Sequence, residues 1–154
     1  MMRLGILSDT HGLLRPEAME ALRGVGLIVH AGDVGDPEIL TKLRTIAPVF
    51  AVRGNVDTEA WARELPEASV VEADGANLYV LHNLQHLDLK PEDAGFDVVI
   101  SGHTHEPKQY ERNGVLYLNP GSAGPRRFRL PVTLAILDAT RKPLWAEIFP
   151  LLPS

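Results

Sequence analysis

The sequence has 154 residues, 45% of them hydrophobic and 23% charged, which is the balance of a globular protein with a single domain over residues 1–154. It contains no cysteine, which excludes disulfides, thiolate nucleophiles and cysteine-ligated zinc or iron–sulfur sites. The formal net charge is -5 and the densest basic cluster is Arg126, Arg127 and Arg129, so we expect no binding of duplex nucleic acid.

The dominant pattern along the chain is a series of short apolar runs, whose length and β-branched content favour buried strands over helices. In chain order they cover residues 4–7, 27–29, 49–52, 78–81, 98–100, 115–118, 134–137 and 145–149. Residues 16–23 and 37–46 read as helices, the second with Asp36 as a candidate N-cap, and residues 58–65 as a shorter helix. The first half therefore predicts parallel strands with helical crossovers, and we expect a largely antiparallel second half. Together they predict an α/β domain with two sheets packed face to face.

A residue that can bind a metal follows five of these runs. These residues are Asp9 and His11, Asp33, Asn55, His82, and His103 and His105. Ligands of α/β sheets bind beyond the carboxyl ends of strands, so a fold that gathers five such ends gathers these seven side chains. Two carboxylates, four imidazoles and one amide oxygen suit divalent first-row metals. Gly32, Gly54 and Gly102 stand directly before a ligand and permit close backbone approach.

Seven ligands are too many for one small cation, so the pattern predicts two divalent ions about 3.5–4 Å apart that share a carboxylate. A hydroxide between them is the natural nucleophile for an in-line displacement at phosphorus. We expect Asp33, Asn55 and His82 to serve catalysis as well as metal binding. Taken singly, Asn55 could hold a left-handed turn and His82 could be structural. Jointly that reading fails, because four of the six histidines fall on the pattern in order.

The ordered motifs resemble those of the calcineurin-like metallophosphoesterase superfamily. The motifs are Asp9-x-His11, Gly32-Asp33, Gly54-Asn55-x-Asp57, His82 and Gly102-His103-x-His105. The short length and Asn119-Pro120-Gly121-Ser122 resemble its small YfcE-like phosphodiesterase branch, and the resemblance runs from Arg3 to about Asp138. It implies a four-layer α-β-β-α sandwich of two mixed sheets flanked by helices.

The resemblance also implies how the ligands are shared. Asp33 would bridge the two ions, and the other six residues divide into Asp9, His11 and His105 on one ion and Asn55, His82 and His103 on the other. Manganese is the first choice of metal, with iron, zinc, nickel or cobalt as alternatives that the sequence cannot separate.

Two departures from the family pattern bear on catalysis. Many superfamily members have a histidine after the asparagine, where it acts on the leaving group, whereas this chain has Val56, which cannot donate a proton. The loop after His82 has also diverged, and it continues Asn83-Leu84-Gln85-His86. His86 could replace the missing acid or be a solvated loop residue, and we favour the second reading.

Three arginines are candidates for contacting a substrate phosphate. Arg53 precedes Gly54, and Arg126 and Arg127 follow Pro125 in a predicted loop, where a guanidinium fork suits phosphate oxygens. A surface salt bridge explains Arg53 equally well, and a solvated surface cluster explains the other two.

The leading hypothesis is a two-metal phosphodiesterase that acts on a small or nucleotide-derived phosphoester. The alternatives are a phosphomonoesterase with the same site and a protein-interaction scaffold like the retromer subunit that resembles these enzymes. We expect a cytoplasmic protein without a membrane partner, because the N-terminal apolar run is too short for a signal peptide and no stretch approaches the roughly 20 apolar residues of a membrane span. The sequence leaves a homo-oligomer open.

Overall fold

The computed structural model describes residues 2–153, so the outermost residues of the predicted domain 1–154 lie outside the described part of the chain. Its first sheet is mixed and has the strand order β10-β9-β1-β2-β3. The strands of this sheet are β1 (Arg3–Leu7), β2 (Leu27–His30), β3 (Val49–Ala51), β9 (Thr133–Asp138) and β10 (Glu147–Pro150). The first three are parallel, as the sequence predicts, and β9 and β10 extend the sheet in antiparallel fashion.

The second sheet is also mixed and has the order β4-β5-β6-β8-β7. Its strands are β4 (Ala68–Ala73), β5 (Ala76–Leu81), β6 (Val98–Ile100), β7 (Lys108–Arg112) and β8 (Val115–Asn119). The expectation of a largely antiparallel second half is wrong for its centre, where β5 pairs with β6 and β6 with β8 in parallel. Parallel neighbours need a crossover of about a dozen residues or more, and residues 82–97 supply one.

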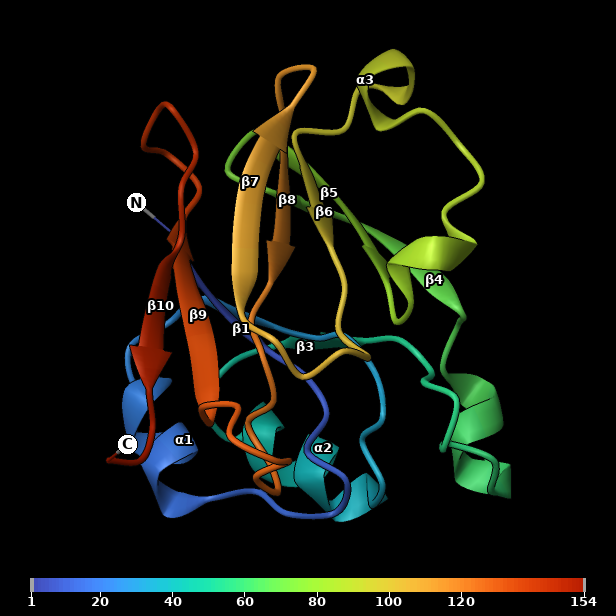
Figure 1. Cartoon of the computed structure of the whole chain (residues 1–154), viewed down its shortest axis with the longest axis vertical. Coiled ribbons are helices and arrows are strands. Elements are labelled where there is room, and N and C mark those ends of the chain that lie inside the picture. Colours follow the sequence, from blue (N-terminus) through green and yellow to red (C-terminus); the bar gives the residue numbers. More distant parts are fainter. Residues whose placement is uncertain (1, 154) are drawn as a thin grey trace.

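Helices are few and unevenly distributed (Figure 1). The α-helices are α1 (Pro16–Ala21), α2 (Pro37–Arg44) and α3 (Pro91–Ala94), and the 3-10 helices are η1 (Ala60–Glu64) and η2 (Leu84–His86). The predicted N-cap of α2 is confirmed, because the Asp36 carboxylate accepts a hydrogen bond of 2.9 Å from the Glu38 amide. The third predicted helix is only the 3-10 turn η1. No helix in residues 2–153 is long and apolar enough to cross a membrane.

Three apolar clusters hold the layers together. The largest lies between the two sheets and includes Leu4, Val29, Leu78 and Ile100. A second joins α1 and α2 to the outer face of the first sheet. A third, smaller cluster covers the outer face of the second sheet beneath η2. The predicted α-β-β-α order is therefore present, with a thin outer layer on the second sheet.

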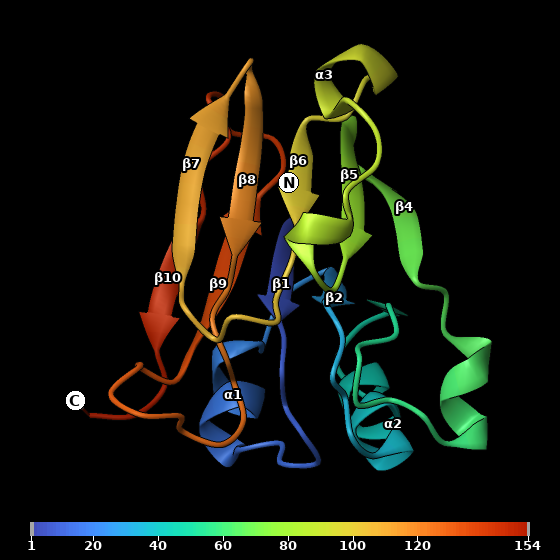
Figure 2. The same cartoon turned by 45° about the vertical axis from the view of Figure 1, so that its right-hand side comes forward.

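The carboxyl ends of the parallel strands from both sheets open toward the same end of the molecule. In Figure 2 the arrowheads of β1, β5 and β6 all point toward the end where α1 and α2 lie. The loops that follow these strands carry the predicted metal ligands. The layered fold thus gathers at one edge side chains that are far apart in the sequence.

Candidate metal centre

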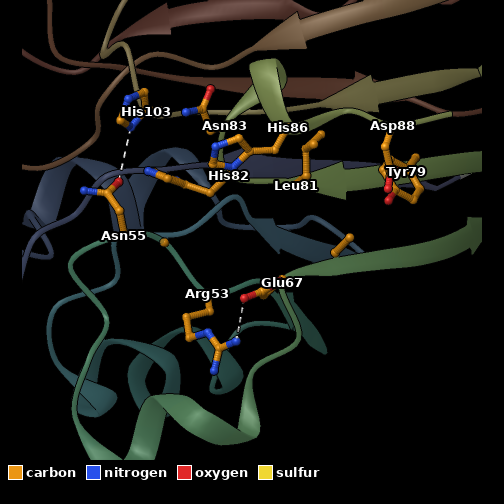
Figure 3. A pocket seen from close by; sticks show the side chains of 12 residues that line it. Arg53, Asn55, Glu67, Tyr79, Leu81, His82, Asn83, His86, Asp88 and His103 are labelled. Atoms are coloured by element: carbon orange, nitrogen blue, oxygen red, sulfur yellow. Dashed lines mark hydrogen bonds and ion pairs between the residues drawn. The ribbon is translucent and has the colours of Figure 1, made fainter.

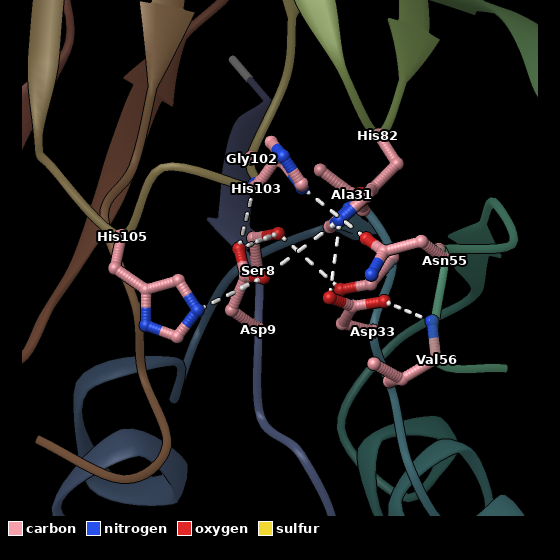
Figure 4. A network of polar contacts seen from close by, with 12 residues as sticks. Ser8, Asp9, Ala31, Asp33, Asn55, Val56, His82, Gly102, His103 and His105 are labelled. Atoms are coloured by element: carbon pink, nitrogen blue, oxygen red, sulfur yellow. Dashed lines mark hydrogen bonds and ion pairs between the residues drawn. The ribbon is translucent and has the colours of Figure 1, made fainter. Parts of the chain in front are cut away.

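The structure brings all seven predicted ligands into one site, and Figure 4 labels six of them, all except His11. Three of the loops that carry them follow strands of the first sheet and two follow strands of the second. The residues are Asp9 and His11 after β1, Asp33 after β2, Asn55 after β3, His82 after β5, and His103 and His105 after β6. The site therefore bridges the two sheets.

Asp9, His11 and His105 form the first group of side chains that could hold a metal ion. His11 Nε2 lies 3.5 Å from Asp9 Oδ1 and 3.2 Å from His105 Nε2, and His105 Nε2 lies 3.4 Å from Asp9 Oδ1. The second carboxylate oxygen, Asp9 Oδ2, accepts hydrogen bonds from the Ser8 hydroxyl and the His103 amide, at 2.8 and 3.0 Å. These bonds fix the carboxylate with Oδ1 directed at the two imidazoles.

Asp9, Asp33 and His82 form the second group. His82 Nε2 lies 3.1 Å from Asp33 Oδ2 and 3.9 Å from Asp9 Oδ1. On the other edge of the ring, His82 Nδ1 donates a hydrogen bond of 2.8 Å to the Ala31 carbonyl, since a carbonyl can only accept. This bond fixes the tautomer, so the neutral ring keeps its lone pair on Nε2, facing the carboxylates.

Asp9 is the residue common to the two groups, whereas the family resemblance implies a bridge by Asp33. Asp33 also faces both groups, because its Oδ2 lies 3.6 Å from His11 Nε2 and 3.1 Å from His82 Nε2. Its Oδ1 accepts a hydrogen bond of 3.0 Å from the Val56 amide, which sets the orientation of the carboxylate. The geometry is therefore compatible with Asp33 as the bridging ligand.

Asn55 and His103 lie on the open side of the site. His103 Nδ1 is 3.2 Å from Asn55 Oδ1, and the His103 ring meets the His82 ring edge-on with centroids 5.2 Å apart. Both residues are exposed, unlike the buried Asp9, Asp33 and His82. The amide and imidazole thus flank the second group where a ligand enters.

Five of the seven predicted ligands have positive φ angles, in a region that residues other than glycine rarely adopt. They are Asp9 (57°), His11 (46°), Asp33 (56°), His103 (74°) and His105 (63°). Such conformations cost about 1–3 kcal/mol each and cluster at functional sites. The predicted close approach at Gly54 is also present, because a Cβ atom there would overlap the Asp33 carboxylate.

The acidic and imidazole groups shift each other's pKa. Burial would raise the pKa of Asp9, but contacts with His105 and His11 outweigh it and hold that pKa far below its ordinary value. Burial would also raise the pKa of Asp33, but the contact with His82 outweighs it, so this pKa is lowered. Asp9 raises the pKa of His11, and Asp33 raises the pKa of His82 against the effect of burial. The site is thus a cluster of anionic carboxylates and protonatable imidazoles, in which a cation can replace protons.

Three buried atoms of the site have no hydrogen-bond partner within the described chain: Asp9 Oδ1, His82 Nε2 and His105 Nδ1. Leaving a buried polar atom unpaired costs about 1–3 kcal/mol, so each such atom calls for an explanation. Asp9 Oδ1 and His82 Nε2 belong to the two groups that could hold a metal, and a bound divalent ion would satisfy both. The residues present therefore fit two divalent cations in donor type and in placement.

Behind the ligands, a buried histidine ties two of the loops together. His30 Nδ1 accepts from the Gly32 amide at 3.1 Å, so His30 Nε2 donates to the Thr10 hydroxyl at 3.0 Å. The Thr10 hydroxyl in turn donates to the Val34 carbonyl at 2.9 Å. Burial lowers the pKa of His30 to about 4, so its ring is neutral and serves to hold the backbone. Sequence reasoning missed Thr10, whose only signal is a polar side chain between two predicted ligands.

Asp57 and Asn119, both part of the motifs quoted above, also hold ligand loops. Asn119 Nδ2 donates to the Gly102 carbonyl at 3.0 Å and the Thr104 hydroxyl at 3.1 Å, which fixes the loop that carries two histidines. The buried Asp57 carboxylate accepts from three amides, those of Val34, Gly35 and Gly54. Neither residue faces the metal groups directly.

A pocket of about 450 Å³ opens beside Asn55 and His103 (Figure 3). Arg53 lines it, but its guanidinium lies 3.0 Å from the Glu67 carboxylate, so its charge is paired. His86, the alternative general acid, is exposed and lines the same pocket. The diverged loop therefore faces the site.

Arg126 and Arg127 do not line this pocket. Arg126 donates a hydrogen bond of 3.1 Å to the Pro153 carbonyl on the surface. The charge of Arg127 opposes the rise in the pKa of His11 that Asp9 causes, so its field reaches the first group of ligands. Of the two, Arg127 remains the candidate for contact with a phosphate.

The chain matches proteins of one family. A family model described as the calcineurin-like phosphoesterase superfamily domain matches residues 2–142. A probable metallophosphoesterase of Methanothermobacter thermautotrophicus is 38% identical, over 96% of this chain and 91% of its own. A solved archaeal phosphodiesterase is 29% identical with a TM-score of 0.80, over 96% of this chain and 100% of its own. Vps29 of Chaetomium thermophilum, at 18% identity and a TM-score of 0.77 over 96% and 94% of the two chains, shares the fold. The chain belongs to the calcineurin-like phosphoesterase superfamily.

Proposed function

We propose that this metal-dependent phosphoesterase hydrolyses the phosphodiester bonds of small substrates, with two divalent ions held by the seven predicted ligands. The observation that carries the proposal is the convergence of two unpaired buried atoms, Asp9 Oδ1 and His82 Nε2, on the space between the carboxylates. The similar proteins, a probable metallophosphoesterase and an archaeal phosphodiesterase, support the same chemistry.

In this proposal Asp33 bridges the two ions. The remaining ligands are Asp9, His11 and His105 for one ion and Asn55, His82 and His103 for the other. Manganese is the first choice of metal in this proposal, and iron, zinc, nickel and cobalt suit the same mixed set of carboxylates and imidazoles. The proposal takes residues 1–154 as one cytoplasmic domain, which the family match over residues 2–142 and the cysteine-free sequence support.

Divalent ions at such a site supply positive charge to the phosphoryl oxygens and lower the pKa of a bound water to about 7. The chain's own residues set the geometry. Asn55 and His103 flank the open side, where the phosphoryl group enters, and the buried Asp9 and Asp33 bring the negative charge that the cations require. Val56, which is 45% exposed beside the site, offers no proton to the leaving group. His86, which lines the pocket from the diverged loop, could supply that proton.

The pocket beside Asn55 and His103 favours a diester over a monoester substrate. Its volume of about 450 Å³ leaves room for a second ester arm, which a monoester does not have. The scaffold alternative draws on the fold shared with Vps29, but all seven ligand positions are filled in this chain.

The proposal is tested by assaying the metal-loaded protein on bis(4-nitrophenyl) phosphate and on 4-nitrophenyl phosphate. We expect the higher kcat/KM on the diester, loss of activity in chelator, and recovery on addition of Mn²⁺. A higher kcat/KM on the monoester would replace the proposal by the monoesterase. No turnover of either ester by protein with bound metal would favour the scaffold.

A further inference from the structure

A second pocket, of about 360 Å³, lies on the other side of His103, over the outer face of the second sheet. Tyr110 of β7, Tyr117 of β8 and Leu84 of η2 line it, and we call it the tyrosine pocket. It shares His103 and Asn83 with the pocket beside the metal centre. The chemistry proposed above gives it no role, although it adjoins the site.

The two tyrosines give this pocket an aromatic surface. Tyr110 and Tyr117 are register partners in the β7–β8 hairpin, and their rings are parallel to within 1° with centroids 5.2 Å apart. Tyr117 is buried and Tyr110 is half-buried, so Tyr117 supports the ring of Tyr110, part of which faces the pocket. A planar, rigid pair of this kind suits a flat ligand better than a flexible aliphatic one.

The charges around the tyrosine pocket balance. Lys108 and Glu106 are its charged lining residues. The Nζ atom of Lys108 lies over the Tyr110 ring, 5.6 Å from its centroid, so a ligand that stacks on Tyr110 must displace this flexible side chain. The exposed Gln85 adds an amide with both a donor and an acceptor. The first pocket differs, because its lining includes two carboxylates, those of Glu67 and Asp88, and Arg53 already pairs with Glu67. A neutral planar group with polar edges therefore fits the tyrosine pocket better than the first pocket.

The two pockets meet at His103, on the open side of the metal centre. His103 Nδ1 lies 3.2 Å from Asn55 Oδ1, and Asn55 lines only the first pocket, whereas His103 lines both. A phosphodiester has two ester arms that diverge from the phosphorus. A phosphate held beside this pair can place one arm in each pocket.

We propose that the tyrosine pocket binds the nucleobase of a nucleoside phosphodiester, an inference that rests on the proposed function. A nucleobase is neutral and planar, stacks on aromatic side chains, and carries donors and acceptors along its edge for an amide such as that of Gln85. Stacking of one base on an aromatic side chain is worth about 10- to 100-fold in affinity. The substrate class is therefore a nucleoside phosphodiester, with its base on Tyr110 and its second arm in the first pocket.

The test compares two competitive inhibitors of bis(4-nitrophenyl) phosphate hydrolysis, adenosine 5′-monophosphate and methyl phosphate. Both carry the same phosphate group, so the ratio of their Ki values measures the nucleoside alone, wherever the nitrophenyl groups sit. We expect the nucleotide to bind about 10- to 100-fold more tightly. Tyr110→Leu should bring the ratio close to one, whereas Tyr110→Phe, which keeps the ring, should largely preserve it.

Arg112→Ala is the matched control. Arg112 is exposed on the same strand and the same face as Tyr110, two residues further along, but does not line the pocket. Its substitution should leave the Ki ratio unchanged. Equal Ki values for the two inhibitors in the wild-type protein, or a ratio that Tyr110→Leu does not change, would overturn the inference. If the protein does not hydrolyse the diester at all, the proposed function fails instead, so the two failures are distinguishable.

Discussion

Asp57 is the residue whose substitution tests most sharply how the fold holds the metal centre. Its side chain is 4% exposed, and its carboxylate lies between the loop that carries Asp33 and the loop that carries Asn55. Oδ2 accepts hydrogen bonds from the amides of Val34 and Gly54 at 3.2 and 2.9 Å, and Oδ1 accepts from Gly35 at 3.0 Å. Asp57→Asn keeps the shape of the side chain and removes its charge, so it isolates these bonds.

The asparagine can keep two of the three hydrogen bonds at best. With its carbonyl oxygen at the Oδ2 position, its NH2 group faces the Gly35 amide, which then has no acceptor. Gly35 is exposed and its bond to Asp57 is only partly buried, so its unpaired amide costs about 1 kcal/mol, the low end of the range for buried donors. The two bonds that change from charged to neutral lose about 1 kcal/mol each. The sum is about 3 kcal/mol, which for a chain of this length lowers Tm by roughly 6–12 °C.

Thermal and urea unfolding in chelator measure this loss on the metal-free protein, and a metal titration shows whether the loosened loops bind more weakly. Asp74→Asn is the matched control, because Asp74 lies in an exposed turn with φ 48°, a conformation that asparagine tolerates. We expect the control to unfold like the wild type. Wild-type stability and wild-type metal affinity in Asp57→Asn would refute the role assigned to Asp57.

Metal binding, leaving-group dependence and the bridging position each give a further test. The pKa values of His11 and His82 are raised, so protons compete with metal ions for these imidazoles already above the ordinary histidine pKa of about 6.5. Metal affinity should therefore fall as the pH falls toward and below that value, and calorimetry should show that metal binding releases protons. A metal affinity that stays constant over these pH values would contradict this prediction. Val56→His should raise rates by up to about 10²–10⁴ on the poorest leaving groups, and His86→Ala should lower them if His86 is the acid. Identical plots of rate against leaving-group pKa for all three proteins would show that neither position matters. Asp33→Ala should abolish turnover and weaken binding of both ions, and elemental analysis showing wild-type metal content would rule out the bridge.

The α/β class and the family could be predicted because their signals are local. Each parallel strand is a short apolar run, and most of these runs are buried, although β3 at the edge of the first sheet is not. The residue that follows each run is then placed at the sheet's carboxyl edge by the chain direction alone. Asp9 after β1 and His82 after β5 are found in this way, although they belong to different sheets.

Other features depend on contacts that no local pattern carries. The strands β4 and β7 were missed because they lie at the two edges of the second sheet, where polar and charged residues such as Lys108 and Arg112 interrupt the apolar pattern. The parallel pairing of β5 with β6 depends on the crossover between them rather than on either strand. The pairing of Arg53 with Glu67 and the stacking of Tyr110 on Tyr117 join residues brought together only by the fold.

The central claim is that the seven predicted ligands hold two metal ions, and the most direct measurement is the metal content of the pure protein after loading with Mn²⁺ and removal of free metal. The account predicts about two ions per chain in the wild type. It also predicts that His82→Ala, which removes an unpaired buried nitrogen of the second group, loses about one of them. A content of zero, together with full activity in strong chelator, would contradict the account.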